Sequence, residues 1–230
     1  MTSDFVGQRF WGRASGLSYS DLVLTDCEFN SCVVARDAGS PQSRFERIEV
    51  VGAAQLNCSV TGAVLRDVRL HDLKRLGDAP LFLWGCLFER VILSGRISAI
   101  KINRNAALPN APPERQREHD AAVEQFYRAS DWALDISKAE FAGGVTFEAV
   151  PGDKVRRDPE RQVIVRRASL NGDEWRNIDF DRTAIDIGLS WFEGSSPFDS
   201  VVLASRSDRK WAKRDLAVFR RLCDAGIASA

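Results

Sequence analysis

Large apolar residues recur at every fifth position through much of the first half of the chain. The first run consists of Tyr19, Leu24, Phe29 and Val34. Two positions before each of these stands a second, usually smaller apolar residue: Leu17, Leu22, Cys27 and Cys32. A period of five matches neither the 3.6-residue repeat of an α-helix nor the alternation of a single strand. It fits a four-sided coil in which each side takes five residues and directs two side chains inward.

The repeat resumes after each of two breaks. Following ARDAGSPQS, the large positions are Phe45, Val50, Gln55, Val60, Leu65 and Leu70. Following HDLKRLGDAP, they are Leu83, Phe88 and Leu93, and the pattern returns in WALDISKAEF at Ile136 and Phe141. Inward side chains of successive coils would stack about 4.8 Å apart, the spacing of hydrogen-bonded strands. Each coil would be buried only by its neighbours, which predicts a mainly β solenoid.

Four cysteines occupy the smaller inward position of the repeat. They are Cys27, Cys32, Cys58 and Cys86. Free cysteine behaves as a small buried apolar residue, so we expect core packing. Disulfides or metal ligation are the alternatives, although no cysteine pair has the spacing of a common zinc site and a cytoplasmic chain disfavours disulfides.

The segments CEF, AVL, CLF and AEF resemble the centre of the pentapeptide-repeat motif, in which a small and a polar residue precede Leu or Phe. Pentapeptide-repeat proteins form right-handed quadrilateral β-helices, and the resemblance implies this fold over residues 17–102 and 131–148. The match is degenerate, because Cys, Val, Ile or Leu often replaces alanine and Gln55 stands at a large position.

The other segments are expected to interrupt and cap this coil. Residues 103–113 predict a linker, and the next segment predicts an amphipathic helix with Ala122, Phe126 and Ala129 on one side. FVGQRFW, with Phe5, Phe10 and Trp11, is expected to plug the N-terminal end. We therefore expect a β-helix over 1–148, an inserted helix at about 110–130, and an α-containing C-terminal capping region over 149–230.

Helix signals mark the C-terminal region. Asp158-Pro159 predicts a helix start, although VIVRRASL is equally compatible with a strand. The segment 183–192 predicts a short helix ending at Gly194. A final helix is expected to begin after Ser207 or Asp208 and to end near Gly226.

Composition and motifs disfavour several function classes. The 32 basic and 32 acidic residues cancel, so no overall charge attracts nucleic acid or anionic lipid. No apolar run approaches the roughly 20 residues of a membrane helix, and the N-terminus lacks a signal-peptide pattern, so we expect a cytoplasmic protein. The common phosphate-loop, nucleophile-elbow and zinc-protease motifs are missing. We expect no enzyme, no cofactor and no metal.

Candidate binding residues lie in the C-terminal region. The segment KVRRDPERQVIVRR is basic, and Arg156, Arg157 and Arg161 are candidates to contact phosphate or an acidic protein. The alternative is a solvated surface with local ion pairs to acidic neighbours. Trp191 and Trp211 are candidate interface anchors, because tryptophan is enriched at interface centres.

A rigid coil without a natural cleft predicts a non-enzymatic module that binds another protein. Small bacterial proteins of this appearance often neutralise one partner, so an immunity or antitoxin-like role is favoured by analogy. The partner's identity is unknown, a membrane or nucleic acid is not expected, and oligomerisation is open.

Two alternative functions remain. The family resemblance includes proteins that mimic DNA and bind type II topoisomerases, which would require a continuous acidic face. An enzyme with a site between the coil and the C-terminal region would use His119, Asp131 or Asp135. The simpler expectation places His119 on a solvated helix surface and gives Asp135 a turn or cap role.

Overall fold

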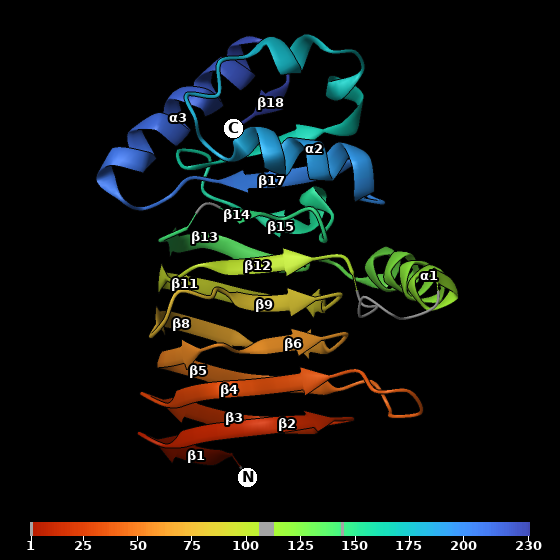
Figure 1. Cartoon of the computed structure of the whole chain (residues 1–230), viewed down its shortest axis with the longest axis vertical. Helices are drawn as coiled ribbons and strands as arrows, with labels where there is room; N and C mark the ends of the chain where they lie inside the picture. Colours follow the sequence, from red (N-terminus) through yellow and green to blue (C-terminus); the bar gives the residue numbers. More distant parts are fainter. Residues whose placement is uncertain (1, 106–112, 144) are drawn as a thin grey trace.

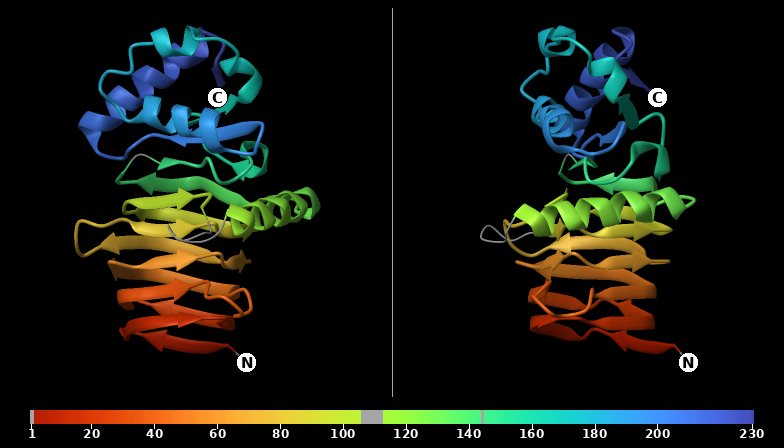
Figure 2. Two further views of the ribbon diagram at one scale, coloured as in Figure 1. Left: turned by 45° about the vertical axis from the view of Figure 1, so that its right-hand side comes forward. Right: turned by 90° about the vertical axis from the view of Figure 1, so that its right-hand side faces the viewer.

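The computed structural model describes residues 2–105, 113–143 and 145–230. Most of its strands form one parallel sheet that is curled on itself, here called the curled sheet (Figures 1 and 2). An antiparallel sheet and two helices lie at its C-terminal end, and one further helix lies beside it. The expectation of a mainly β fold is confirmed.

Fourteen strands of the described chain belong to the curled sheet. They are β1 (Ser3–Val6), β2 (Arg9–Ser15), β3 (Ser18–Thr25), β4 (Glu28–Ala35), β5 (Arg44–Leu56), β6 (Ser59–Thr61), β7 (Val64–Arg66), β8 (Arg69–Arg75), β9 (Leu81–Trp84), β10 (Leu87–Glu89), β11 (Val91–Ile97), β12 (Ile100–Asn103), β13 (Leu134–Phe141) and β15 (Val155–Arg156). Their pairing is parallel throughout, so segments far apart in sequence lie side by side.

The large apolar positions of the repeat stack on one another across these strands. In one column Tyr19 pairs with Phe45, Phe45 with Leu65, and Leu65 with Phe88. A second column runs through Phe5, Leu24, Val50, Leu70 and Leu93. The stacking of residues spaced by fives, which the sequence predicted, is confirmed at these positions.

The sheet bends at residues with left-handed backbone conformation. One bend uses Asp21, Arg47, Asp67 and Arg90, with φ between 52° and 59°. Another alternates glycine with aspartate: Gly7, Asp26, Gly52, Asp72 and Gly95. Glycine adopts this conformation without steric cost, and aspartate tolerates it. Glycine also leaves room for a neighbouring side chain at two of these positions, because a Cβ on Gly52 or Gly95 would displace the carboxylate of Asp26 or Asp72.

The four repeat cysteines point into the interior. Cys27, Cys58 and Cys86 are buried, Cys32 is partly buried, and all are free thiols. Each thiol donates to a carbonyl oxygen of the neighbouring strand, at Phe5, Phe10, Phe29 and Val60 over 3.2–3.5 Å. Burial raises the pKa of Cys86 to about 12, which makes this thiol unreactive. The predicted core role is confirmed.

The N-terminal segment was expected to plug one end of the coil, and this prediction is wrong. β1 and β2 are the first strands of the curled sheet and pair with β3 and β4. Phe5 and Phe10 face its inner side, with ring centroids 6.0 Å apart, whereas Trp11 is exposed. The physical reason is that Phe5 and Phe10 already follow the five-residue spacing, so the segment pairs as strands. The second predicted break also begins too early, because β8 continues to Arg75.

Helix α1 (Pro113–Ala129) confirms the inserted helix. Its buried side, however, carries His119, Val123 and Tyr127, with Phe126 partly buried, while the predicted Ala122 and Ala129 are exposed. The alanines lose little by facing solvent, whereas the Tyr127 ring packs edge-on against Phe126 and Phe198. Most of the predicted linker, 106–112, lies outside the described residues.

The C-terminal region contains the antiparallel sheet β14 (Val145–Thr146), β17 (Ser200–Ala204), β16 (Gln162–Arg166) and β18 (Ala228–Ser229). The helices α2 (Ile185–Ser195) and α3 (Arg209–Asp224) and the short 3-10 segments η1 (Gly152–Lys154), η2 (Arg167–Leu170) and η3 (Glu174–Asn177) complete it. The two sheets interlock in sequence, because β14 pairs with β17 whereas the later β15 pairs with β13.

Two of the three helix predictions in this region are confirmed. α2 covers the predicted short helix with slightly shifted ends, and α3 begins after Asp208, whose carboxylate accepts from the backbone N–H groups of Lys210 and Trp211. The prediction of a helix after Asp158-Pro159 is wrong. The Asp158 carboxylate accepts from the Glu160 N–H at 3.0 Å in a turn, and strand β16 follows. The alternative prediction of a strand is therefore the correct one.

Candidate functional site

The three candidate arginines each contact groups of their own chain. The Arg156 guanidinium lies 4.1 Å from the Trp132 ring centroid. Arg157 donates to the Ala230 carbonyl oxygen at 2.9 Å, and Arg161 forms a 3.2 Å ion pair with Glu140. These local partners differ from one arginine to the next, so the structure does not gather the three into one free cationic patch. Their role in binding a partner stays a prediction.

The two candidate tryptophans are on different helices. Trp191 of α2 is 45% exposed, and the Lys101 ammonium lies 5.1 Å from its ring centroid. Trp211 of α3 is covered by Arg206 at 4.0 Å and by Arg214 at 5.2 Å. Trp191 therefore keeps the more accessible ring, whereas Trp211 is held within a cluster of cations.

His119 is buried in the contact between α1 and the curled sheet, which corrects its expected place on a solvated surface. An Arg36 N–H lies 3.1 Å from His119 Nδ1. Burial, followed by repulsion from the Arg36 charge, lowers the pKa of His119 to about 4, so the ring is a neutral acceptor near pH 7. The reason for the misplacement is that helical spacing puts His119 in line with Val123 and Tyr127.

The other acidic candidates have local roles. Asp135 accepts from the hydroxyl of Ser137 at 2.7 Å and from its backbone N–H at 3.1 Å, a local role, although it lies inside strand β13 and not in a turn. Asp131 is exposed in the short loop between α1 and β13. His119 contacts Arg36 and Asp135 contacts Ser137, so these side chains have separate environments.

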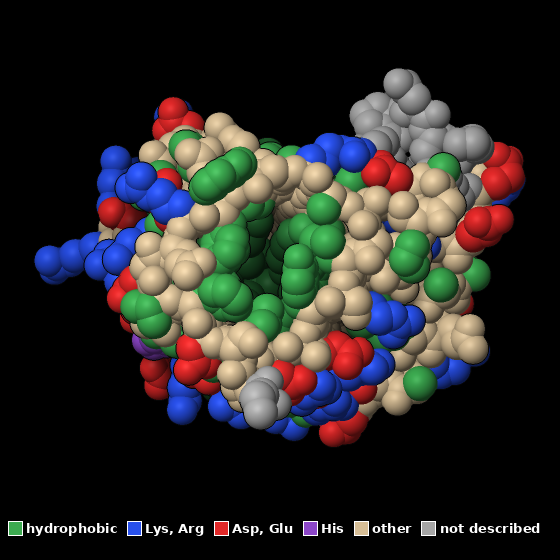
Figure 3. Space-filling view, turned by 90° about the horizontal axis from the view of Figure 1, so that it is seen from below, with side chains coloured by type: hydrophobic (Ala, Val, Ile, Leu, Met, Phe, Trp, Pro, Cys, Tyr) green, Lys and Arg blue, Asp and Glu red, His purple; other side chains and the backbone are tan. Residues whose placement is uncertain are grey.

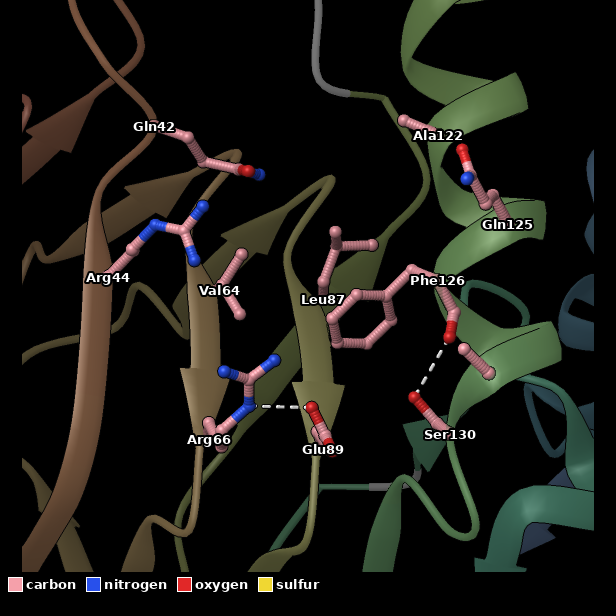
Figure 4. Close-up of a pocket in the computed structure, with 11 residues that line it drawn as sticks. Gln42, Arg44, Val64, Arg66, Leu87, Glu89, Ala122, Gln125, Phe126 and Ser130 are labelled. Carbon is pink, nitrogen blue, oxygen red and sulfur yellow. Dashed lines mark hydrogen bonds and ion pairs between the residues drawn. The ribbon is translucent and has the colours of Figure 1, made fainter.

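An open groove lies between α1 and the outer face of the curled sheet (Figure 4). Its volume is about 420 Å³. The floor is apolar and consists of Val64 on β7, Leu87 on β10 and Phe126 on α1. The wall is polar and carries Gln42, Arg44, Arg66, Glu89, Gln125 and Ser130. We call this site the α1 groove.

Neighbouring positions of the repeat explain why the floor is apolar. Leu65 and Phe88 point into the curled sheet, so the adjacent Val64 and Leu87 point outward, where α1 covers them. Tyr127 of α1 also accepts a hydrogen bond from the Phe88 N–H at 3.2 Å. The Phe88 N–H lies on the edge of β10, where a further strand would otherwise pair. The Tyr127 hydroxyl of α1 takes the place of a carbonyl oxygen of such a strand.

Arg44 is the charged residue of the α1 groove whose charge is not balanced by another described residue. Arg66 pairs with Glu89 at 2.7 Å and with Glu46 at 3.4 Å. Arg44 is exposed and forms no ion pair with any residue in the described part of the chain. Figure 4 shows its guanidinium directed toward the space between Gln42 and Val64. The α1 groove therefore combines an apolar floor with one available positive charge.

Beside the α1 groove, charges alternate along one bend of the sheet. Asp21 pairs with Arg47 at 2.6 Å, and Asp67 pairs with Arg90 at 2.7 Å. The hydrogen bond from Arg47 lowers the pKa of Asp21 to about 2. All four residues have left-handed backbone, so the same bend in successive strands brings opposite charges together. This surface is locally neutral.

Glu148 is a buried acid at the junction of the two sheets. Glu148 is 6% exposed, and its Oε2 atom has no hydrogen-bond partner within the described chain. Burial raises the pKa of Glu148 to about 7, and the charge of Lys101 opposes this shift only in part.

We expect Glu148→Gln to stabilise the protein above pH 7. The carboxyl has an ordinary pKa near 4.5 in the unfolded chain, so between about pH 4.5 and 7 only the unfolded chain ionises and the wild type loses stability as the pH rises. The gain from Glu148→Gln should therefore grow over this range to about 3 kcal/mol, level off above pH 7, and vanish below about pH 4, where both states are protonated. Urea unfolding of both proteins across this pH range measures it. A gain independent of pH would contradict this account.

Comparison of the chain with protein-family models and with curated proteins finds no match. Within the described residues, no cluster of three or more His, Cys, Asp or Glu side chains has a geometry that could hold a metal ion. None of the helices in this part of the chain combines the length and apolar character needed to cross a membrane.

The α1 groove was not predicted from the sequence. The one available signal was the apolar identity of Val64 and Leu87 at positions where the repeat usually carries polar residues. Recognising it required knowing that α1 folds back on these two strands.

Proposed function

We propose that the curled sheet is a degenerate, pentapeptide-like right-handed β-helix and that the protein is a non-enzymatic module that binds one partner protein. The β-helix is supported by columns of stacked inner residues, such as Tyr19, Phe45, Leu65 and Phe88. The left-handed residues between paired segments support it too, since each would turn one corner of a four-sided coil.

The observation that carries the binding proposal is Arg44, which has no ion pair among the described residues and lies above the apolar floor of the α1 groove. A partner segment with a carboxylate beside an apolar side chain matches both features. The carboxylate would pair with Arg44 in bidentate geometry, and the apolar side chain would cover Val64, Leu87 and Phe126. Because the strands around the groove are held by their ladders, binding would order few protein groups.

An immunity or antitoxin-like role remains the specific version of this proposal, by analogy alone. In that role the α1 groove would hold an acidic segment of the toxin. A cytoplasmic location is consistent with the free thiols inside the sheet, and it is part of the same proposal.

The two alternative functions have less support. A DNA mimic needs a continuous acidic face, whereas the bend beside the α1 groove alternates Asp21, Arg47, Asp67 and Arg90. An enzyme site that joins the proposed candidates would need His119 and Asp135 to face one substrate, but each is engaged by a different local partner. We therefore favour the binding module.

Replacing Arg44 with glutamate is expected to weaken capture of the partner at least tenfold, about 1.4 kcal/mol, because a negative wall repels the carboxylate. The measurement is quantitative pull-down from the native host, followed by titration of the recovered protein. Arg69→Glu is the matched control, since Arg69 is also exposed and lies on β8. A partner that binds Arg44→Glu as well as the wild type, or no recovered partner, would contradict the proposed site.

A further inference from the structure

The N-terminal end of the curled sheet is open in the part of the chain that the structure describes. Figure 3 looks onto this end and shows a hollow lined with apolar side chains. Its rim is formed by β1, β2 and the first residues of β3, Ser18–Ser20. Within the described chain each of these segments pairs on one edge only. The opposite edges present backbone N–H and C=O groups, which seek another strand.

Burial along the inner columns shows the same asymmetry between the ends. Tyr19 at the rim is 48% exposed, although it occupies the same column as Phe88, which is 2% exposed. The other end is covered by the antiparallel sheet with α2 and α3 (Figure 1). The molecule thus has one open end and one capped end.

We propose that a second copy of the chain covers this end, giving a two-fold dimer joined rim to rim. Viewed along the axis of the curled sheet, the chain runs around the rim in one rotational direction. A copy turned over by a two-fold axis follows it in the opposite sense, so every rim strand meets an antiparallel strand. Antiparallel edges form a regular ladder, and the two apolar hollows close on each other.

The capped end limits this assembly to two copies. Head-to-tail stacking would need a second open end and would generate filaments. With only one open end, the contact uses the same surface on both copies and is complete in the dimer.

The rim also carries complementary charges. Asp4 of β1 is exposed and forms no ion pair among the described residues. Arg9 of β2 has a side chain 75% exposed, with one contact to Glu28 at 3.4 Å. In the antiparallel register that sets Ser3 of β1 opposite Phe10 of the partner subunit, Asp4 lies opposite Arg9 of the partner subunit, and symmetry forms this pair twice.

The size of the end sets the expected affinity. Sides of about five residues at 3.3 Å each enclose an end face on the order of 500 Å² per copy once side chains are included. The total of roughly 1,000 Å² lies at the lower limit of specific interfaces. We therefore expect a dimer that dissociates in the micromolar range.

The test is sedimentation equilibrium of the full chain from low to hundreds of micromolar concentration. The wild type should pass from monomer to dimer and no further. Tyr19→Lys should raise the dissociation constant at least tenfold, because it places a charge over the closed hollow. Trp191→Lys is the matched control, since Trp191 is 45% exposed but lies at the capped end, and it should leave dimerisation unchanged.

A charge swap tests the rim geometry independently and uses only exposed side chains. Asp4→Arg and Arg9→Asp should each weaken the dimer, and the double variant should recover most of the loss. Circular dichroism checks that each variant is folded. A monomer at all concentrations, a filament, or a dimer that responds to Trp191→Lys rather than Tyr19→Lys would overturn the proposal. The experiment needs no partner protein, so its outcome is separate from that of the α1 groove.

Discussion

Phe88→Ala is expected to lower the free energy of unfolding by about 3–5 kcal/mol. Phe88 is fully enclosed inside the curled sheet, stacked on Leu65 and close to α1 through the hydrogen bond from its N–H to Tyr127. Removing the ring leaves a cavity that rigid strand ladders on several sides cannot close. The cost should therefore lie at the upper end for a buried aromatic residue.

Equilibrium unfolding in urea, followed by circular dichroism, measures the loss. Phe82→Ala is the matched control, because Phe82 on β9 is only partly buried and stacks on Trp84 at 5.3 Å between ring centroids. It should cost about 1 kcal/mol. Equal losses for Phe82→Ala and Phe88→Ala would show that the inner column does not hold the sheet together.

The second large effect is expected for Asp215→Ala in α3. The Asp215 side chain is 3% exposed and accepts from Arg206 through Nε at 2.9 Å, through Nη2, and from its backbone N–H at 2.9 Å. Removing the carboxylate leaves the guanidinium, 17% exposed beneath the Trp211 ring, without its counter-charge. Breaking one partner of a buried pair costs about 3–5 kcal/mol.

Unfolding followed by tryptophan fluorescence reports this loss, because Trp211 covers the pair. Asp153→Ala is the control, since Asp153 and Arg166 are 3.2 Å apart at an exposed site and should contribute less than about 1 kcal/mol. Replacing Arg206 and Asp215 together with apolar residues should cost less than Asp215→Ala alone. If the single and double variants lost the same amount, unpaired charge would not be the cause.

Local spacing accounts for the parts of the fold that were predictable. A five-residue period specifies which side chains face inward irrespective of what lies above or below, so the columns and the inward cysteines followed from sequence. The N-terminal cap of α3 is equally local, because the Asp208 carboxylate accepts from N–H groups two and three residues away. Where a local rule had two outcomes, as at Asp158-Pro159, the strand prevailed because β16 pairs with both β17 and β18.

The α1 groove and the burial of His119 depend on contacts between distant segments. Arg36 and His119 come from different parts of the chain, and so do Val64 and Phe126. His119 looked like a solvent-exposed residue in the sequence, whereas burial, followed by repulsion from the Arg36 charge, lowers its pKa and keeps the ring neutral inside the contact.

The five-residue repeat specifies the inner surface of the protein, since it sets side-chain direction through backbone geometry alone. Which end stays open, where α1 lies, and which charges lack a partner among the described residues follow from the folded arrangement. Those outcomes depend on the pairing of surfaces that are remote along the chain, and no short sequence period encodes such pairing.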